Sequence, residues 1–176
     1  MLMAKDEIQE SLDKFKKSVI DDAKKNLQRQ TSTGNLANSL VGVAKKSKNS
    51  IELSFTMKAY GLFQDGGVQG VKGGKSLYGY KYTDKAPPAS AFSQWAIKKL
   101  PEQTRNSKGQ FTSRKSLQFA LARHIYNYGI KPTLFFTKPF EKHYKKLPPE
   151  LLTKYGLKID KLLKKVIDDN IKDIKQ

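Results

Sequence analysis

Apolar side chains recur every three or four positions along residues 5–30, which is the strongest periodic pattern in the chain. The row consists of Ile8, Leu12, Phe15, Val19, Ala23 and Leu27. Charged residues fill the opposite face, and this distribution predicts a long amphipathic helix. A helix with one narrow apolar stripe needs something to lie on, either the protein's own sheet or a neighbouring subunit. We favour packing on its own core.

The positions that follow predict a short helix or turn at 35–40 and then a β-hairpin. Residues 41–46 alternate weakly between apolar and polar side chains, and residues 51–57 alternate clearly. The polar residues 47–50 between them suit a hairpin loop. The second strand is expected to bury its apolar face, which contributes about 1.5–3 kcal/mol for each fully buried side chain.

A glycine- and tyrosine-rich segment covers residues 59–83. Five glycines lie between positions 66 and 74, so the backbone is expected to be mobile or to turn tightly. Tyr78, Tyr80 and Tyr82 then occupy alternate positions, which predicts a strand with three rings on one face. We expect a flexible arm or long hairpin at 64–87. Rings among lysines can stack on single-stranded bases, but more often they form a half-buried strand face or a protein interface.

The second half of the chain predicts further helices. Apolar positions at helical spacing indicate helices near 90–100, 114–128, 139–146 and 149–175, and Gly156 is a point where the last of them can bend. Residues 101–113 are polar and are expected to form an exposed loop.

The stretch of residues 129–144 concentrates aromatic and backbone-restricting residues. Gly129 ends a helical pattern, Pro132 blocks its continuation, and Phe135 and Phe136 form an apolar run. We expect this stretch to be the point where the helices meet the sheet. Together the elements predict an α+β fold in which a small antiparallel sheet packs against a long N-terminal helix, two or more middle helices and a long C-terminal helix.

Composition fits a single domain, 1–176, with a basic centre. The 176 residues suffice for a real core, and the absence of cysteine fits a reducing compartment. No run approaches the ~18 apolar residues of a membrane span, and the start of the chain lacks the apolar region of a signal peptide. We therefore expect no membrane partner and no secretion by that route.

The net charge of +18 is concentrated in residues 41–140, which hold seventeen Lys/Arg against four Asp/Glu. Such a field attracts polyanions, whether nucleic acid, anionic lipid or an acidic protein. The alternative interpretation is a lysine-rich surface that is only solvated.

The sequence offers no specific catalytic or metal-binding motif. Residues 70–76, GVKGGKS, are similar to a phosphate-binding loop but have one residue too few before Gly-Lys-Ser. His124 and His143 stand on different elements without the further ligands that a metal needs. The carboxylates of the basic centre are scattered, which argues against a magnesium-dependent nuclease: Glu52, Asp65, Asp84 and Glu102. We expect neither an enzyme nor a cofactor.

The order of these features resembles the neck and tail-completion proteins of tailed bacteriophages, small α+β proteins that join head and tail. After the first helix comes a Thr-Gly-x-Leu-x-x-Ser turn at 33–39, and after the hairpin an aromatic-plus-glycine segment at 60–67. A Pro-Pro-led helix carrying Trp95 follows, then Gly-Ile-x-Pro at 129–132, the Phe-Phe segment and a C-terminal helix. The resemblance covers most of the chain, although the segment 64–87 is longer and the charge higher than the family pattern.

The resemblance implies a structural virion protein of the phage neck or tail, assembled in the bacterial host cytoplasm. Such a protein acts through protein–protein contacts in a homo-oligomeric ring of six or twelve subunits. The implied partners are other neck, portal-adjacent or tail proteins, with non-specific contact to packaged DNA. The alternative hypothesis is a stand-alone basic nucleic-acid-binding protein, which would bind DNA in a strongly salt-dependent way.

Two sets of residues are candidates for these contacts. The aromatic residues expected at the subunit interface are Tyr60, Phe63, Tyr78, Tyr80, Tyr82, Phe135 and Phe136. The cations expected to face DNA are Lys72, Lys75, Lys81, Lys85, Arg105, Lys108, Arg114 and Lys115.

Overall fold

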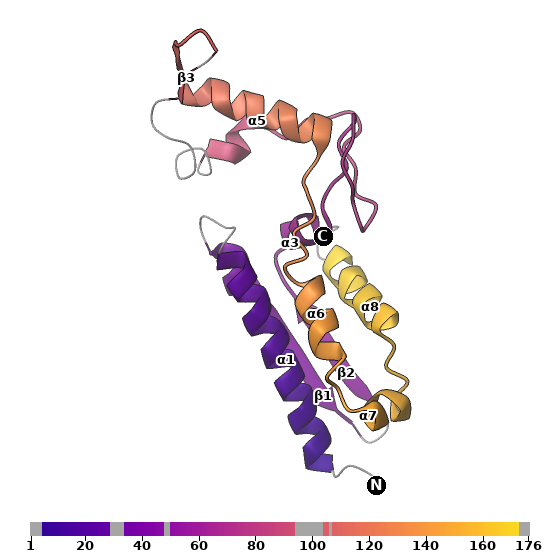
Figure 1. The fold of residues 1–176 in the computed structure, drawn as a ribbon. Helices are drawn as coiled ribbons and strands as arrows, with labels where there is room; N and C mark the ends of the chain where they lie inside the picture. Colours follow the sequence, from indigo (N-terminus) through magenta and orange to yellow (C-terminus); the bar gives the residue numbers. More distant parts are fainter. Residues whose placement is uncertain (1–4, 29–33, 48–49, 94–103, 106, 173–176) are drawn as a thin grey trace. The chain divides into compact units, whose positions relative to one another are not determined.

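The computed structural model describes residues 5–28, 34–47, 50–93, 104–105 and 107–172 (Figure 1). It confirms an α+β fold with a small antiparallel hairpin and long helices near both ends of the chain. The chain divides into two compact units: unit 1 is Met1–Asp65 with Leu134–Gln176, and unit 2 is Gly66–Thr133. The single domain predicted from the sequence stays a prediction, since compactness alone does not show which parts fold together.

Unit 1 is built on helix α1 (Lys5–Gln28) and the hairpin of β1 (Val41–Lys46) and β2 (Ile51–Thr56). All six residues of the apolar row on α1 are buried, which confirms that the helix lies on the chain's own core. Between helix and hairpin, α2 (Asn35–Ser39) matches the predicted short helix. In Figure 1, α1, the hairpin and α6 (Thr137–Tyr144) run side by side.

The centre of unit 1 is a cluster of phenylalanines from three elements. Phe15 of α1, Phe55 of β2 and Phe140 of α6 meet edge to face, with ring centroids 5.3–6.3 Å apart. Phe136 joins them at 5.3 Å from Phe55. Edge-to-face geometry sets the positive ring edge against the negative ring face and adds to the burial of these large side chains. The stretch 129–144 therefore meets the sheet here, as predicted.

The C-terminal region forms two helices, so the single helix predicted at 149–175 is wrong. Helix α7 (Pro149–Lys154) ends before Gly156, whose φ of 58° is left-handed, and α8 (Ile159–Lys172) follows. A left-handed glycine is a common way to end a helix. Helix α8 packs against β2, and its fully buried Asn170 accepts the Met57 N–H (2.9 Å) and donates to the Phe55 carbonyl (2.8 Å).

Asp65 fixes the place where the chain returns to unit 1. It stands near the end of α3 (Tyr60–Gly66) and is 1% exposed. Its carboxylate accepts the N–H groups of Phe136 (2.7 Å) and Thr137 (3.2 Å), as well as the Thr137 hydroxyl (2.5 Å). The first amides of a helix lack partners within it, so Asp65 caps α6 from a distant part of the sequence.

The described residues of unit 2 include the long helix α5 (Arg114–Tyr128), which lies at the predicted position. The 3-10 helix η1 (Ala89–Phe92) packs against it, and a short hairpin of β3 (Thr104–Arg105) and β4 (Phe111–Thr112) precedes it. This hairpin lies within the loop predicted at 101–113. Most of the helix predicted at 90–100, with Trp95, falls outside the described residues.

Candidate interaction surface

Several large apolar side chains of unit 2 lie at the surface. Among the described residues, twenty of the twenty-two buried apolar side chains belong to unit 1, and unit 2 contributes Val68 and Ala122. Five of the seven exposed large apolar side chains belong to unit 2: Val71, Leu77, Phe111, Phe119 and Tyr128. Exposed apolar side chains mark a binding surface where they gather in a patch, so their arrangement on each element matters.

The outward face of α5 combines aromatic rings with cations. Lys115, Phe119 and Arg123 follow one another at helical steps of four and are all exposed, Phe119 by 58%. His124 and Tyr128 form a second exposed row, with ring centroids 5.0 Å apart. We call these five residues the α5 face. Its flat rings between positive charges suit a partner that offers apolar or planar groups together with negative charge.

The loop of residues 67–88 is fastened to the C-terminal end of α5 by its backbone. The N–H of Val71 donates to the Tyr126 carbonyl (3.0 Å), and the N–H of Lys72 donates to the Asn127 carbonyl (2.8 Å). Gly70 permits this approach, because a Cβ there would lie 2.3 Å from the Asn127 carbonyl oxygen. The amides of the phosphate-loop-like segment therefore satisfy helix carbonyls. They are not arranged around a phosphate.

The tyrosine strand predicted at 78–82 is wrong. These residues form no strand, and Lys81 makes an isolated parallel bridge with Gln69. Gly79 has a φ of 77°, a left-handed conformation that interrupts an extended backbone. The alternation in the sequence therefore does not place three rings on one face.

Tyr78, Tyr80 and Tyr82 are half-buried within unit 2. The Tyr78 ring covers Gly66, where a Cβ would lie 2.3 Å from it, and Tyr80 meets Tyr78 edge to face with centroids 6.5 Å apart. Tyr82 meets Tyr126 of α5 at 6.2 Å. Burial raises the pKa values of the Tyr80 and Tyr82 hydroxyls. These rings hold the loop 67–88 in place more than they offer a flat surface to a partner.

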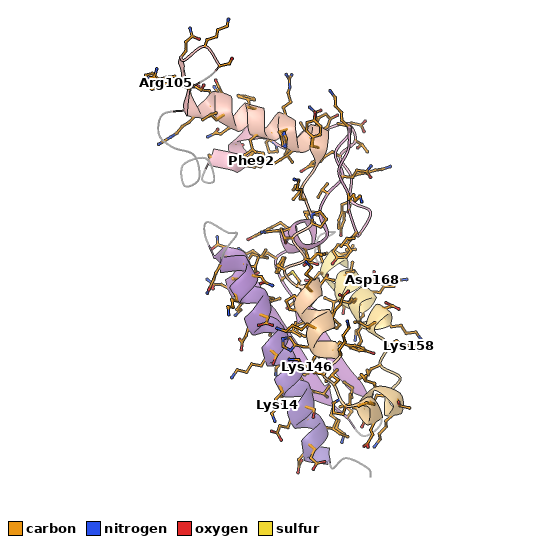
Figure 2. All side chains as sticks on the ribbon, in the orientation of Figure 1. Lys14, Phe92, Arg105, Lys146, Lys158 and Asp168 are labelled. Carbon is orange, nitrogen blue, oxygen red and sulfur yellow. The ribbon has the colours of Figure 1, made fainter. Side chains whose placement is uncertain are left out.

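The β3–β4 hairpin carries a second pairing of cation and ring. The Arg105 guanidinium lies 4.2 Å from the centroid of the Phe111 ring, and it donates to the Gly109 carbonyl (2.7 Å). Phe111 remains 59% exposed. Figure 2 labels Arg105 at this hairpin, which precedes α5 directly in the chain.

The two units also differ in their ratio of basic to acidic residues. Unit 2 holds twelve Lys/Arg against two Asp/Glu, a net charge of +10, and unit 1 holds twenty-two against fourteen, a net charge of +8. The eight cations predicted to face DNA all lie in unit 2 and are all exposed: Lys72, Lys75, Lys81, Lys85, Arg105, Lys108, Arg114 and Lys115. The field that the sequence assigns to the middle of the chain is thus a property of unit 2.

The remaining predicted interface residues lie in unit 1. Tyr60 is 44% exposed and Phe63 is half-buried, both on α3, and burial raises the pKa of the Tyr60 hydroxyl. Phe135 and Phe136 are only 1% and 3% exposed and pack inside the core. Both rings belong to the stretch that was expected to meet the sheet, and this packing buries them. The prediction that Phe135 and Phe136 lie at a subunit interface is therefore wrong.

Groups suited to catalysis do not converge in the part of the chain that the structure describes. His143 contacts Asp22, and His124 contacts Tyr128. Asp65 is committed to capping α6. The described residues contain no cluster of three or more His, Cys, Asp or Glu side chains that could hold a metal ion. None of their helices is long and apolar enough to cross a membrane.

Sequence analysis did not single out Phe119, Arg123 and Tyr128 as contact residues, because the apolar positions of residues 114–128 were used only to predict a helix. The signal that was available is the four-residue spacing between these rings and neighbouring cations.

Comparison of the chain with protein-family models, with curated proteins and with solved structures found no match to any of them.

Proposed function

We propose that the chain is a structural subunit of a phage neck or tail, and that it joins an oligomeric ring through contacts made by unit 2. The observation that carries the assembly role is that five large apolar side chains of unit 2 are exposed, whereas only two of its described apolar side chains are buried. A subunit that completes its burial against neighbours has this distribution, because the same side chains become an interface core on assembly. The α5 face and the exposed ring of Phe111 are the contact groups.

The phage setting rests on the order of the sequence features. The long first helix, the turn at 33–39, the hairpin and the Phe-Phe segment are similar in order to those of neck and tail-completion proteins. Within such a ring the +10 charge of unit 2 suits weak contacts with passing DNA, since phosphate contacts carry no sequence information.

The test is the particle mass at physiological salt, measured by light scattering after size exclusion over a series of protein concentrations. We expect a species of six or twelve times the chain mass of 19.9 kDa, seen as rings in electron micrographs. Retention of the particle at high salt would show that apolar contacts hold it, because screening weakens contacts between exposed charges. A mass of one chain at every concentration contradicts the self-assembling ring.

A second candidate function is nucleic-acid binding by the isolated chain, favoured by the twelve-to-two excess of cations in unit 2. It requires tight binding of single-stranded DNA by a monomer or dimer, with an affinity that falls steeply as salt rises. Replacing Lys72 and Lys75 by Gln should then weaken binding, whereas the same change at Lys161 and Lys164 of α8 should have little effect. Tight binding without a large particle would favour this candidate over the ring.

A further inference from the structure

Two hollows of about 390 and 270 Å³ lie between α1 and the segment of α6 and the residues that follow it in unit 1. We call the two hollows together the α1–α6 groove, and its role is independent of that of the α5 face. The first is lined by α1 residues from Asp22 to Asn26 and the second by α1 residues from Ser11 to Ser18. Positions 11 to 26 of a helix span about 22 Å, at ~1.5 Å for each residue. The groove is therefore long enough for a short segment of another chain.

Five lysines line the two hollows: Lys14, Lys25, Lys138, Lys142 and Lys146. Figure 2 labels Lys14 on α1 and Lys146 just after α6, and both lysines line the second hollow. The single carboxylate in the lining is Asp22, which already accepts from Lys142 (2.7 Å) and from His143 (2.9 Å). The groove therefore carries a clear excess of positive charge.

Two of the five lysines are in ion pairs, and the other three have their charge available for a ligand. Lys142 pairs with Asp22, and Lys14 pairs with Glu10 at 2.7 Å. The Lys14 pair is weak, because both of its side chains are more than 60% exposed. Lys25, Lys138 and Lys146 make no ion pair among the described residues. They lie at both ends of the groove, Lys25 and Lys138 in the first hollow and Lys146 in the second.

The lining also contains apolar side chains, Pro139 in the first hollow and Phe15, Leu147 and Pro148 in the second, beside the polar Asn26, Ser11 and Ser18. Its aromatic rings are little exposed, Phe15 by 4% and the His143 side chain by 12%. Bases of single-stranded nucleic acid bind by stacking on accessible rings, which this lining does not provide, since Phe15 is only 4% exposed. Carboxylates spaced by aliphatic side chains match both features of the groove. We propose that the α1–α6 groove binds an acidic peptide segment of a partner protein, whose carboxylates meet Lys25, Lys138 and Lys146.

The test uses the full chain and a fluorescent peptide of repeated Glu-Glu-Leu, with binding followed by anisotropy. Replacement of Lys138 and Lys146 by Glu is expected to weaken binding at least tenfold. Replacement of Lys161 and Lys164 by Glu is the matched control, because both lysines are exposed on α8 of the same unit and the net charge changes equally. The control is expected to change the affinity less than twofold. Lys25→Glu, a single exposed change at the other end of the groove, gives an independent variant.

Three results would overturn the inference. Equal loss in the groove variant and the α8 control would mean that the peptide responds to overall charge. A single-stranded oligothymidylate probe that competes with the peptide, and is weakened equally by the groove variant, would make the groove a general polyanion site. Loss of self-association in the groove variant, seen by light scattering, would assign the groove to a second copy of the chain.

Discussion

Units 1 and 2 use the same kinds of side chain in opposite ways. Unit 1 packs Phe15, Phe55 and Phe140 into a core and pairs several of its charges, as between Lys142 and Asp22. Unit 2 exposes Phe119, holds few buried apolar side chains among its described residues, and has six cations for each carboxylate. The contrast shows that apolar content alone does not predict a core. Where the apolar positions alternate with cations, as on α5, they form a surface.

This comparison predicts different consequences for the same substitution in the two units. A change in unit 1 should lower the free energy of unfolding, because its side chains are already buried. A change at the surface of unit 2 should leave the isolated chain stable and alter association instead. For three substitutions in unit 1, the same substitution at a residue of the same type in unit 2 serves as the control.

The largest effect is expected for Phe55→Ala, at the centre of the aromatic cluster and 0% exposed. Truncation leaves a cavity among Phe15, Phe136 and Phe140 and should lower the free energy of unfolding by about 3–5 kcal/mol. Phe119→Ala, the same change on the α5 face, should alter it by less than about 0.5 kcal/mol. Urea denaturation of both variants measures the difference. Similar losses would mean that unit 2 buries Phe119 in solution.

The next effect is expected for Asp65→Ala. This change leaves the amides of Phe136 and Thr137 and the Thr137 hydroxyl without their acceptor in a buried place. The loss should be about 2–4 kcal/mol, because a buried donor without a partner is costly. Asp84→Ala, in the exposed loop of unit 2, is the control and should change stability little. An equal effect of the two changes in thermal unfolding would argue against Asp65 as the cap of α6.

A smaller effect is expected for Asn170→Ala on α8. Its side chain bonds to the backbone of Met57 and Phe55, so the variant leaves one buried N–H and one buried carbonyl unsatisfied. We expect a loss of about 1–3 kcal/mol in urea denaturation. Asn127→Ala, on the half-buried side of α5, serves as the comparison and should be close to neutral. A neutral Asn170→Ala would show that α8 is not fixed to β2 by this residue.

The smallest effect is expected for the contribution of the Asp22 carboxyl to the pH dependence of stability. Hydrogen bonds from Lys142 and, to a lesser extent, His143 hold the pKa of this carboxyl below its ordinary value of 3.8. A carboxyl with a lowered folded pKa stabilises the fold fully above the unfolded pKa and loses this contribution as pH falls through the folded one. The side chain is 34% exposed, so the contribution is small. Thermal midpoints of wild type and Asp22→Asn should converge as pH drops below 3.8, and divergence there would contradict this role.

Much of unit 1 could be predicted from the sequence because its periodic patterns coincide with its burial. The row from Ile8 to Leu27 and the alternation in residues 51–57 both point inward. The bounds of the last helix could not be predicted, because a glycine such as Gly156 can either bend a helix or end it. The left-handed φ of Gly156, seen only in the structure, shows that it ends α7. The burial of Phe135 and Phe136 likewise depends on Asp65, which caps α6 from seventy residues away in the chain.

The candidate surface was harder to predict than the fold. The sequence predicted the positive charge of this surface, since every cation expected to face a polyanion is exposed in unit 2. The rings that it named, Tyr78, Tyr80 and Tyr82, are half-buried in the loop 67–88, and their place at an interface stays a prediction. Phe119 and Tyr128, which it did not name, are exposed. Local alternation cannot show which side of a loop or helix faces a core that distant residues build.

The most direct test of unit 2 as the contact surface compares the particle masses of Phe119→Glu and Val41→Glu by light scattering. The two wild-type side chains are similarly exposed, by 58% and 54%, but Val41 lies on β1 of unit 1. A charge on the α5 face should reduce the proposed ring of six or twelve chains to smaller species, and Val41→Glu should leave the particle mass unchanged. A ring that survives Phe119→Glu, or is lost equally in both variants, would contradict assembly through unit 2.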